Sequence, residues 1–322
     1  MNHLYIDHPG SHIGIRQNQL VIKKTNGKEQ AYPLQQIDRI TVTTQANFSG
    51  AALNTLFRQS ISTLFCSPSG YFRGNLQSSS NGGAQVQRRA AQYRLIPSTD
   101  LNLPLATNLI AAKIRNQQRV LYDWNNQHSE ALSPYARAVE RATSLDALRG
   151  YEGQAAKLYF SGLAEKLTGT AFVFTRRERP ATDPVNALLS FSYALLQSEF
   201  AIAIDHYGMD RFAGFFHASD GDQPALILDL MEPFRPLADR LAIRMLSSQL
   251  SPEAFLKKDG QCRLQDGSRG QYLKAWEQLM NQTKLWRGEQ GSYRRLIERH
   301  TGQWANYLDG QISQPNWWRL SG

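Results

Sequence analysis

The spacing of apolar residues changes along the chain, and the change divides the chain into two parts. In the first part, apolar and polar positions alternate within short segments that are rich in β-branched residues, which predicts β-strands. These segments are HLYIDH, SHIGIRQ, QLVIKK, RITVTT, ISTLFCS and YFRGNLQ. SGAALNTLFRQS has the spacing of a helix, and Gly10 and Asn26-Gly27 stand where hairpin turns are expected. The first part is therefore predicted to be a small, mostly antiparallel β domain with one helix.

Beyond residue 77, six small polar residues, SSSNGG, offer no apolar face for packing and predict a linker. After them, apolar residues recur at helical intervals, as in LIAAKIRNQQRVLYDW and NALLSFSYALLQSEFAIAI. The predicted fold class is α+β. A small β-rich N-terminal domain (1–77) is followed by a linker (78–92) and by a larger all-α C-terminal domain (93–322).

Composition and charge favour a folded chain with a polyanionic partner. The length of 322 residues suits two domains, and 41% hydrophobic residues are enough to form a core. Lys and Arg outnumber Asp and Glu by 36 to 27, which gives a formal charge of +9. This excess favours nucleic acid as the partner, ahead of an anionic membrane, although proteins that bind neither often carry a similar charge.

Targeting signals and cysteine usage indicate the compartment. The N-terminal MNHLYIDHPGSHIGI lacks the basic and long apolar regions of a secretory signal, and no stretch approaches about 18 consecutive apolar residues. Cys66 and Cys262 lie in different predicted domains and form no CxxC pair. We therefore expect a reduced, cytoplasmic protein that does not bind membranes.

Three separate segments each place one metal-ligand side chain in apolar surroundings. They are LRGYEGQAAKLYF around Glu152, FAGFFHAS around His217 and LILDLMEPFRP around Glu232. The ligands are 65 and 15 residues apart, so only a folded domain can bring them together. Two carboxylates with one imidazole suit a divalent ion, and the pattern predicts a single metal site.

Each of these residues also has a structural interpretation. Glu152, beside glycines and alanines, suits the floor of a pocket, but a helix dipole also favours an exposed Glu in a first helical turn. His217, at the edge of an apolar run, is more often a core residue than a ligand. Asp229 and Glu232 share a helix face and attract a cation, or they form a surface acidic pair; the apolar ALIL before them favours the functional interpretation. Pro233 predicts a helix break just after Glu232.

The segment DPVNALLSFSYALL begins like a helix, with Asp183 as its cap and Pro184 in its first turn. Asn186, in the same turn, is a candidate to face the active cleft. Just upstream, three arginines form a basic cluster that would hold phosphates, although such a run is more often a solvated surface. These arginines are Arg176, Arg177 and Arg179.

Together, these segments resemble the CRISPR-associated adaptation endonuclease/integrase family, and the resemblance extends along the chain. It implies a β-rich N-terminal domain that mediates dimerisation and a helical C-terminal domain with a Glu, His, Glu/Asp metal set. By this resemblance Glu152, His217 and Glu232 correspond to the metal ligands and catalytic residues. Asp229 corresponds to a nearby acidic residue that supports the catalytic site.

The resemblance also implies the reaction and the partners. Asn186 matches a family motif position as a catalytic candidate, and Arg235 matches another as a DNA-binding candidate beside the three upstream arginines. The expected cofactor is Mn²⁺ or Mg²⁺, which would prepare a phosphodiester for attack by water or by the 3′ hydroxyl of a short DNA fragment. The expected partners are DNA (short duplex fragments and the CRISPR repeat), a second copy of the chain in a homodimer, and the small second CRISPR adaptation protein.

Two other functions stay open on the sequence. The first is a non-catalytic nucleic-acid-binding protein in which the acidic residues and His217 are structural, and the second is a metal-dependent hydrolase of a small substrate. Activity that survives removal of Glu152 or Glu232 would indicate the first, and activity insensitive to salt and competitor DNA would indicate the second. Aromatic residues of the basic C-terminal stretch, such as Tyr272 and Trp276, either stack on bases or belong to the core. The terminal QPNWWRLSG has no assigned role.

Overall fold

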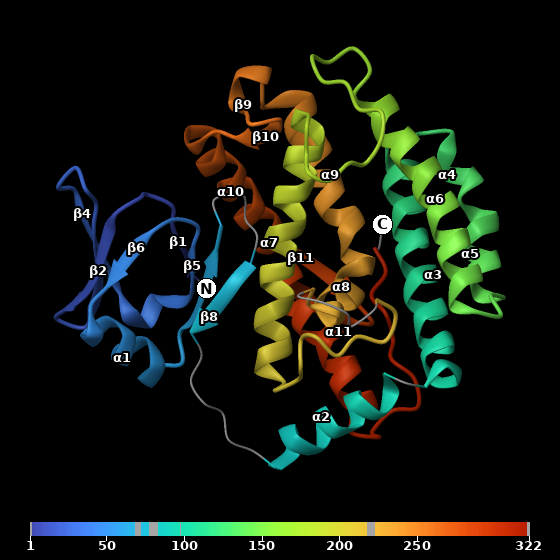
Figure 1. Cartoon of the computed structure of the whole chain (residues 1–322), viewed down its shortest axis with the longest axis horizontal. Coiled ribbons are helices and arrows are strands. Elements are labelled where there is room, and N and C mark those ends of the chain that lie inside the picture. Colours follow the sequence, from blue (N-terminus) through green and yellow to red (C-terminus); the bar gives the residue numbers. More distant parts are fainter. Residues whose placement is uncertain (1, 68–71, 77–82, 97, 218–222, 321–322) are drawn as a thin grey trace. The chain divides into compact units, whose positions relative to one another are not determined.

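The computed structural model describes residues 2–67, 72–76, 83–96, 98–217 and 223–320. The chain forms two compact units, Met1–Asn81 and Gly82–Gly322 (Figure 1). Of the predicted linker 78–92, residues 78–82 lie outside the described residues, and helix α2 (Gly83–Leu95) occupies the remainder. The second unit therefore begins with a helix where the composition predicts a linker.

Two four-stranded sheets and one helix make up the N-terminal unit. Its elements are β1 (Asn2–Ile6), β2 (Ser11–Arg16), β3 (Gln19–Lys23), β4 (Glu29–Pro33), β5 (Ile37–Val42), β6 (Ala46–Phe48), α1 (Gly50–Arg58), β7 (Ser62–Cys66) and β8 (Phe72–Leu76). One sheet has the order β1-β5-β7-β8 and the other the order β4-β3-β2-β6. The six predicted strand segments and the helix are confirmed, whereas β4 and β6, whose sequences EQAYP and ANF lack clear alternation, are additional.

The prediction of a mostly antiparallel domain is wrong, because half of the strand pairs are parallel. The pairs β1/β5, β5/β7 and β2/β6 are parallel, and β2/β3, β3/β4 and β7/β8 are antiparallel. A parallel pair requires a long crossover between its strands. Here β2, β3 and β4 lie between β1 and β5 in the sequence, and β6 and α1 lie between β5 and β7. Alternation indicates where a strand lies but not its direction.

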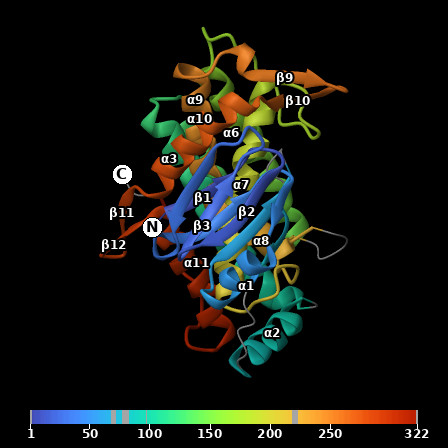
Figure 2. The ribbon, with the colours of Figure 1, turned by 90° about the vertical axis from the view of Figure 1, so that its left-hand side faces the viewer.

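The glycine-based turn predictions are confirmed at one of two positions. Asn26-Gly27 turns the β3–β4 hairpin, where Gly27 has a φ of 81° and its N–H donates to the Lys24 carbonyl at 2.9 Å. Gly10 turns no hairpin, because β1 and β2 belong to different sheets. The β2–β3 hairpin, seen in Figure 2, instead turns at Gln17 and Asn18, which both adopt positive φ. Asn tolerates this conformation better than most residues.

Apolar residues from both sheets and from α1 form one core in the N-terminal unit. Leu20 of β3, Ile40 of β5 and Leu56 of α1 are at most 1% exposed and belong to the same hydrophobic cluster. Cys66 is buried at the end of β7, as is typical of a small hydrophobic residue. The alternation in the sequence therefore corresponds to inward-facing and outward-facing positions.

The C-terminal unit is mainly helical. Its longer elements are α2, α3 (Thr99–Asp123), α5 (Ser133–Glu140), α6 (Leu145–Lys166), α7 (Pro184–His206), α8 (Ala225–Met231), α9 (Arg235–Ser248), α10 (Asp266–Met280) and α11 (Tyr293–Leu308). Short helices are α4 (His128–Ala131), η2 (Glu232–Phe234) and η3 (Pro252–Ala254). The aromatic residues Tyr272, Trp276 and Trp304 are buried, so they belong to the core and do not offer faces for stacking on bases.

The prediction of an all-α C-terminal domain is wrong at two hairpins. β9 (Phe255–Lys258) pairs with β10 (Gln261–Leu264), and β11 (Thr283–Trp286) pairs with β12 (Glu289–Ser292). The first hairpin turns at Asp259-Gly260, both with positive φ. Asp-Gly is a strong hairpin signal, so this turn was accessible from the sequence.

Helix α7 is the central element of the C-terminal unit (Figure 1). Its sequence is apolar all round, and most of its residues are buried. Asp183 caps it by accepting a hydrogen bond from the Asn186 N–H at 2.9 Å, and Pro184 opens its first turn, as predicted. Within the described residues it is the one helix long and apolar enough to cross a membrane, but 83% of its apolar window is buried inside the protein. This burial is typical of a core helix.

Two leucines of α3 test the packing of this unit. Leu109 is fully buried, whereas Leu101 on the same helix is 51% exposed. We expect Leu109→Ala to lower the free energy of unfolding by about 2–5 kcal/mol, because it leaves a cavity. Leu101→Ala makes the same change in side chain and helix propensity and should cost about 0.5 kcal/mol or less. Urea denaturation measures both, and equal losses would contradict the packing.

Candidate metal centre

The three predicted ligands come from separate elements, and two of them, Glu152 and Glu232, lie beside one lysine. Glu152 is the eighth residue of α6, so the interpretation of this residue as a first-turn Glu is wrong. His217 lies in the segment between α7 and α8. Glu232 begins η2, where the α-helix is interrupted at Pro233 as predicted. The fold therefore brings together side chains that no single helix can hold.

Lys113 of α3 lies between two of the predicted ligands. Its ammonium nitrogen is 2.5 Å from Glu152 Oε1 and 2.6 Å from Glu232 Oε2. Burial alone would lower the pKa of Lys113, but the charges of the two glutamates raise it. The lysine is therefore positively charged, and it holds two carboxylates that would otherwise repel each other.

Glu232 is ionised although it is almost completely buried. Burial favours its neutral form, but the positive charges of Arg235 and Lys113, with a contribution from His217, lower its pKa to about 2. Arg235 Nη2 lies 3.0 Å from Glu232 Oε1. The centre therefore holds a buried negative charge at neutral pH.

Asp229 binds the His217 segment through both of its carboxylate oxygens. It accepts hydrogen bonds from the backbone N–H groups of Phe215 (2.6 Å), Phe216 (3.0 Å) and His217 (2.9 Å). The imidazole Nδ1 of His217 is 2.6 Å from Asp229 Oδ1. Because the carboxylate can only accept, Nδ1 carries a proton, and in the neutral ring Nε2 is then the nitrogen with a free lone pair.

Gly214 allows this segment to approach Asp229 closely. A Cβ at position 214 would lie 2.7 Å from the Ala225 Cβ and 2.8 Å from Asp229 Oδ2. No larger residue fits there without moving the backbone of α8 or the Asp229 side chain. The glycine in FAGFFHAS is thus required by packing at the site and not by an unusual φ.

The residues present fit a divalent cation. His217 Nε2 is 3.8 Å from Glu232 Oε1, and its Nδ1 is held by Asp229, an arrangement typical of metal-binding histidines. Although Lys113 lies close to Glu232 Oε2, this buried oxygen accepts no hydrogen bond of good geometry. The ligand atoms of Glu152, His217 and Glu232 do not all lie within 4.8 Å of one another. The ammonium of Lys113 fills the place between the carboxylates.

The arginines predicted to bind DNA differ in their surroundings. Arg176 is exposed and pairs with Glu178, whereas Arg177 and Arg235 both lie over the ring of Tyr193, with guanidinium carbons 5.4 and 5.1 Å from its centroid. Partial desolvation and the charges of Arg235 and Arg177 lower the pKa of Arg179. Three arginines therefore gather beside the metal centre and repel one another, which favours an anion between them.

Asn186 is not brought to the predicted ligands. Its side chain accepts hydrogen bonds from Arg177 Nη1 (2.6 Å) and the Glu178 N–H (3.0 Å) and donates to the Arg176 carbonyl and to Asp183. Within the described residues, none of its hydrogen bonds reaches the metal centre. Asn186 therefore positions the arginine segment, and its catalytic role stays a prediction.

The sequence matches the family model for CRISPR associated protein Cas1 over residues 4–278. The chain belongs to the Cas1 family. A Cas4/Cas1 fusion of Geobacter sulfurreducens is 33% identical over 334 residues, covering 97% of this chain and 59% of the fusion. A Cas1 endonuclease of Francisella tularensis subsp. novicida is 33% identical, covering 76% of this chain and 79% of that protein. The chain spans 59% and 56% of the length of two fusion relatives.

Solved structures share the Cas1 fold of this chain. A casposase bound to an integration product has a TM-score of 0.85 at 20% identity, covering 100% of this chain and 96% of that one. A Cas1 protein from Thermotoga maritima has a TM-score of 0.82 at 22% identity, covering 96% and 97%. A Cas6-RT-Cas1–Cas2 complex has a TM-score of 0.81 at 22% identity, covering 100% of this chain and 36% of that one. At these identities the likeness shows the fold alone.

The C-terminal tail of this Cas1 family member supports the metal centre. Trp318 stacks on Phe234, the last residue of η2, with ring centroids 4.2 Å apart. Asn116 of α3 donates to the Pro233 carbonyl at 2.7 Å and accepts from the Leu320 N–H at 2.8 Å. Residues 314–320 of the tail therefore pack against the turn that presents Glu232.

A buried histidine joins the same tail to α8. His300 Nδ1 accepts from the Trp318 N–H at 3.1 Å, and its Nε2 is 3.0 Å from the Leu230 carbonyl. Burial lowers the pKa of His300 to about 3, so the ring stays neutral and donates from Nε2. His300 is thus a structural histidine.

Sequence patterns did not single out Lys113 or Asn116. One signal was present in IAAKIRN, where Lys113 stands among the buried residues Ala111, Ala112 and Ile114. A charged residue inside an apolar helix face is costly unless it has a partner. Nothing in the sequence indicates that the partners are Glu152 and Glu232.

A buried carboxyl group near Arg177 and Arg235, that of Asp239, has a raised pKa. Tyr193 donates to Asp239 Oδ1 at 2.6 Å and Tyr159 donates to Oδ2 at 3.1 Å. Burial nevertheless raises the pKa of Asp239 from 3.8 to about 6, because these hydrogen bonds and the nearby arginines offset only part of the desolvation. The folded state therefore binds this proton more tightly than the unfolded chain does.

This shift predicts a pH dependence of stability. The proton on Asp239 stabilises the folded state. Its contribution to the free energy of unfolding is complete below the pKa of the unfolded chain, near 4, and is lost as the pH rises through 6. Relative to Asp239→Asn, which stays neutral, the native protein should lose about 3 kcal/mol of unfolding free energy between about pH 4 and pH 7. Urea denaturation of both proteins at each pH measures the difference, and a constant difference would show that Asp239 has an ordinary pKa.

Proposed function

We propose that the chain is a metal-dependent DNA nuclease and integrase of CRISPR adaptation, which inserts short DNA fragments as new spacers into a CRISPR array. The supporting observation is that Glu152 and Glu232 share the ammonium of Lys113, while His217 Nε2 lies 3.8 Å from Glu232 Oε1. Membership of the Cas1 family supports it, as do relatives named as Cas1 endonucleases.

The residues of the centre have distinct roles in this proposal. Glu152, Glu232 and His217 Nε2 would hold Mn²⁺ or Mg²⁺, with Asp229 fixing the imidazole through Nδ1. A bound divalent ion would polarise the phosphodiester and offset the charge that develops on its oxygens. Manganese suits a site with a nitrogen ligand better than magnesium does.

The arginines beside the centre would bind and orient the DNA. Arg177, Arg179 and Arg235 would neutralise the phosphates on either side of the reacting bond, and Arg176 would make an exposed contact. Asn186 holds Arg177 and Arg176 in place through its hydrogen bonds, so we assign it a positioning role.

The reaction is an in-line displacement at phosphorus. In strand transfer, the 3′ hydroxyl oxygen of the fragment forms a bond to phosphorus, and the bond to the 3′ oxygen of the target strand breaks. The attacking hydroxyl loses its proton, and the departing 3′ oxygen gains one. With water as the attacking group, the same displacement cleaves DNA.

The proposed assembly has three partners. DNA binding is supported by the formal charge of +9, and it should weaken steeply with added salt. We further propose that the chain acts in the cytoplasm as a homodimer that binds the small second CRISPR adaptation protein. A Cas6-RT-Cas1–Cas2 complex with the same fold supports this partnership.

Strand transfer into a plasmid that contains a CRISPR repeat tests the proposed function. With Mn²⁺ and the partner protein, Glu152→Gln and His217→Ala should each reduce joining of a short duplex by more than the ~10–100-fold that is typical of outer-shell metal residues. The reason is that each change removes a ligand. Gel analysis of labelled duplex measures both cleavage and joining.

Glu130→Gln is the matched control, because Glu130 is an exposed helical glutamate distant in sequence from the centre. It should retain native activity, and circular dichroism should show all variants folded. Full activity in the folded Glu152 and His217 variants would support the binding-only alternative. Hydrolysis of a small phosphodiester that is unaffected by competitor DNA would support the small-substrate alternative.

Lys113 offers a second test that does not require catalysis. Lys113→Met keeps a similar side-chain volume but removes the charge between two carboxylates, and it should lower stability by about 3–5 kcal/mol in EDTA. Mn²⁺ should then raise the melting temperature of Lys113→Met more than that of the native protein, because the ion replaces the missing charge.

Lys157→Met provides the control for this experiment, since Lys157 is exposed on α6. It should respond to Mn²⁺ as the native protein does. An equal Mn²⁺ shift in all three proteins would show that the ion binds away from Lys113.

A further inference from the structure

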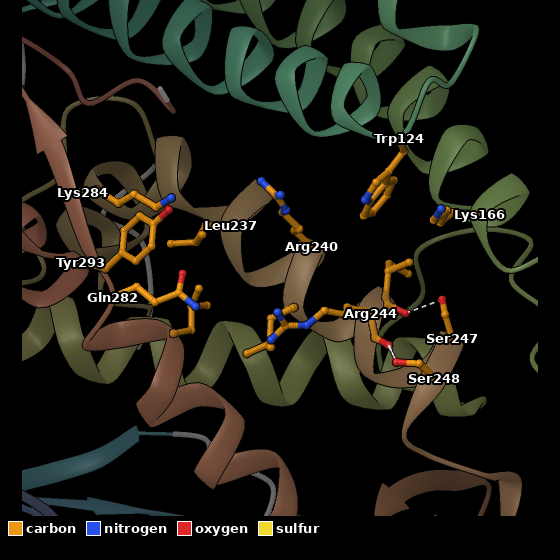
Figure 3. Close-up of a pocket in the computed structure, with 13 residues that line it drawn as sticks. Trp124, Lys166, Leu237, Arg240, Arg244, Ser247, Ser248, Gln282, Lys284 and Tyr293 are labelled. Carbon is orange, nitrogen blue, oxygen red and sulfur yellow. Dashed lines mark hydrogen bonds between the residues drawn. The ribbon is translucent and has the colours of Figure 1, made fainter. Parts of the chain in front are cut away.

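One pocket of the C-terminal unit lies away from the candidate metal centre. Its volume is about 370 Å³, within the range of small-molecule sites. Its lining includes Trp124, Lys166, Leu237, Arg240, Arg244, Lys284 and Tyr293. Figure 3 shows Trp124 and Lys166 at one end, Tyr293 and Lys284 at the other, and the two arginines of α9 between them.

The lining of this pocket is strongly cationic. Four of its side chains are Lys or Arg, and none is Asp or Glu. Arg240 and Arg244 are one turn apart on α9, a like-charge spacing that destabilises a helix. Asp123 pairs with Arg240 at 3.0 Å. Within the described residues Lys166, Arg244 and Lys284 form no ion pair, so an excess of positive charge faces the pocket.

Aromatic side chains accompany these cations at both ends of the pocket. Trp124 is only partly buried, and Lys166 Nζ lies 5.8 Å from its ring centroid. Tyr293 lines the opposite end, and burial raises the pKa of its hydroxyl to about 12, so it is a hydrogen-bond donor at neutral pH. A ligand that suits this lining has an anionic group and a planar ring.

We infer that the pocket formed by Trp124, Arg240, Arg244 and Lys284 binds a nucleotide, with the phosphate on the arginines and the base against Trp124. The shared chemistry is a phosphate joined to a base, and its source is either a free nucleotide or a nucleotide unit at the end of a strand. Arginine suits the phosphate because its planar group donates two parallel hydrogen bonds.

The pocket is separate from the proposed reaction site. Lys166 follows Glu152 by fourteen residues in α6, which corresponds to about 21 Å along the helix. Arg240 and Arg244 lie beyond Arg235 along α9, and neither contacts the three proposed ligands in the described part of the chain. Nucleotide binding therefore goes beyond the proposed function and does not depend on it.

Calorimetry with 2′-deoxyadenosine 5′-monophosphate, in EDTA, tests this inference. The full chain should bind this nucleotide more tightly than deoxyadenosine, which lacks the phosphate, and more tightly than 2-deoxyribose 5-phosphate, which lacks the base. Arg244→Gln should weaken binding by about tenfold or more, because it removes a charge-assisted hydrogen bond. Trp124→Leu should remove the advantage of the nucleotide over deoxyribose phosphate.

Arg263→Gln is the matched control, because Arg263 is an exposed arginine of β10 outside the pocket. Glu152→Gln should retain nucleotide binding even if it abolishes strand transfer, so failure of the proposed function leaves this test intact. Tighter binding of a 5′-phosphorylated trinucleotide would assign the site to a strand end, and tighter binding of the mononucleotide would assign it to a free nucleotide. Absence of binding, or equal effects of Arg244→Gln and Arg263→Gln, would overturn the inference.

Discussion

The candidate metal centre depends on the hydrogen bonds that the buried carboxylate of Asp229 accepts. Three backbone N–H groups and the imidazole of His217 surround it, and Gly214 is small enough to let them approach. A buried charge that loses such donors is strongly destabilised, so the segment 215–217 cannot leave α8 at low cost. Because Glu232 follows Asp229 by three residues, the same interaction fixes the imidazole relative to its neighbouring carboxylate.

Positive charges supply the second constraint. Lys113 and Arg235 keep Glu232 ionised in a place where burial alone would neutralise it. The ammonium of Lys113 also forms an ion pair with Glu152. The tail packs on η2 from the other side through Trp318. The ligands are therefore positioned by the protein itself, and a divalent ion would replace a charge that the fold already accommodates.

The sequence predicted the local elements better than it predicted how strands pair and which side chains meet. Alternation located β5 and β7 but not their parallel direction, which depends on the crossovers between them. Glu152, His217 and Glu232 were singled out as candidate ligands because each interrupts an apolar segment. Lys113 was not singled out, because a sequence does not show that α3 packs against α6 and η2, which bear Glu152 and Glu232. Asn186 was expected to face the cleft, whereas its hydrogen bonds hold the arginine segment.

Anomalous diffraction from a crystal soaked in Mn²⁺ tests the central claim most directly, because it locates the ion without relying on activity. We expect one strong anomalous peak bound by Glu152, His217 Nε2 and Glu232, with Lys113 moved away from the space between the carboxylates. A peak elsewhere in the chain, or an unchanged Lys113 bridge at saturating Mn²⁺, would contradict the assignment of these residues as a metal site.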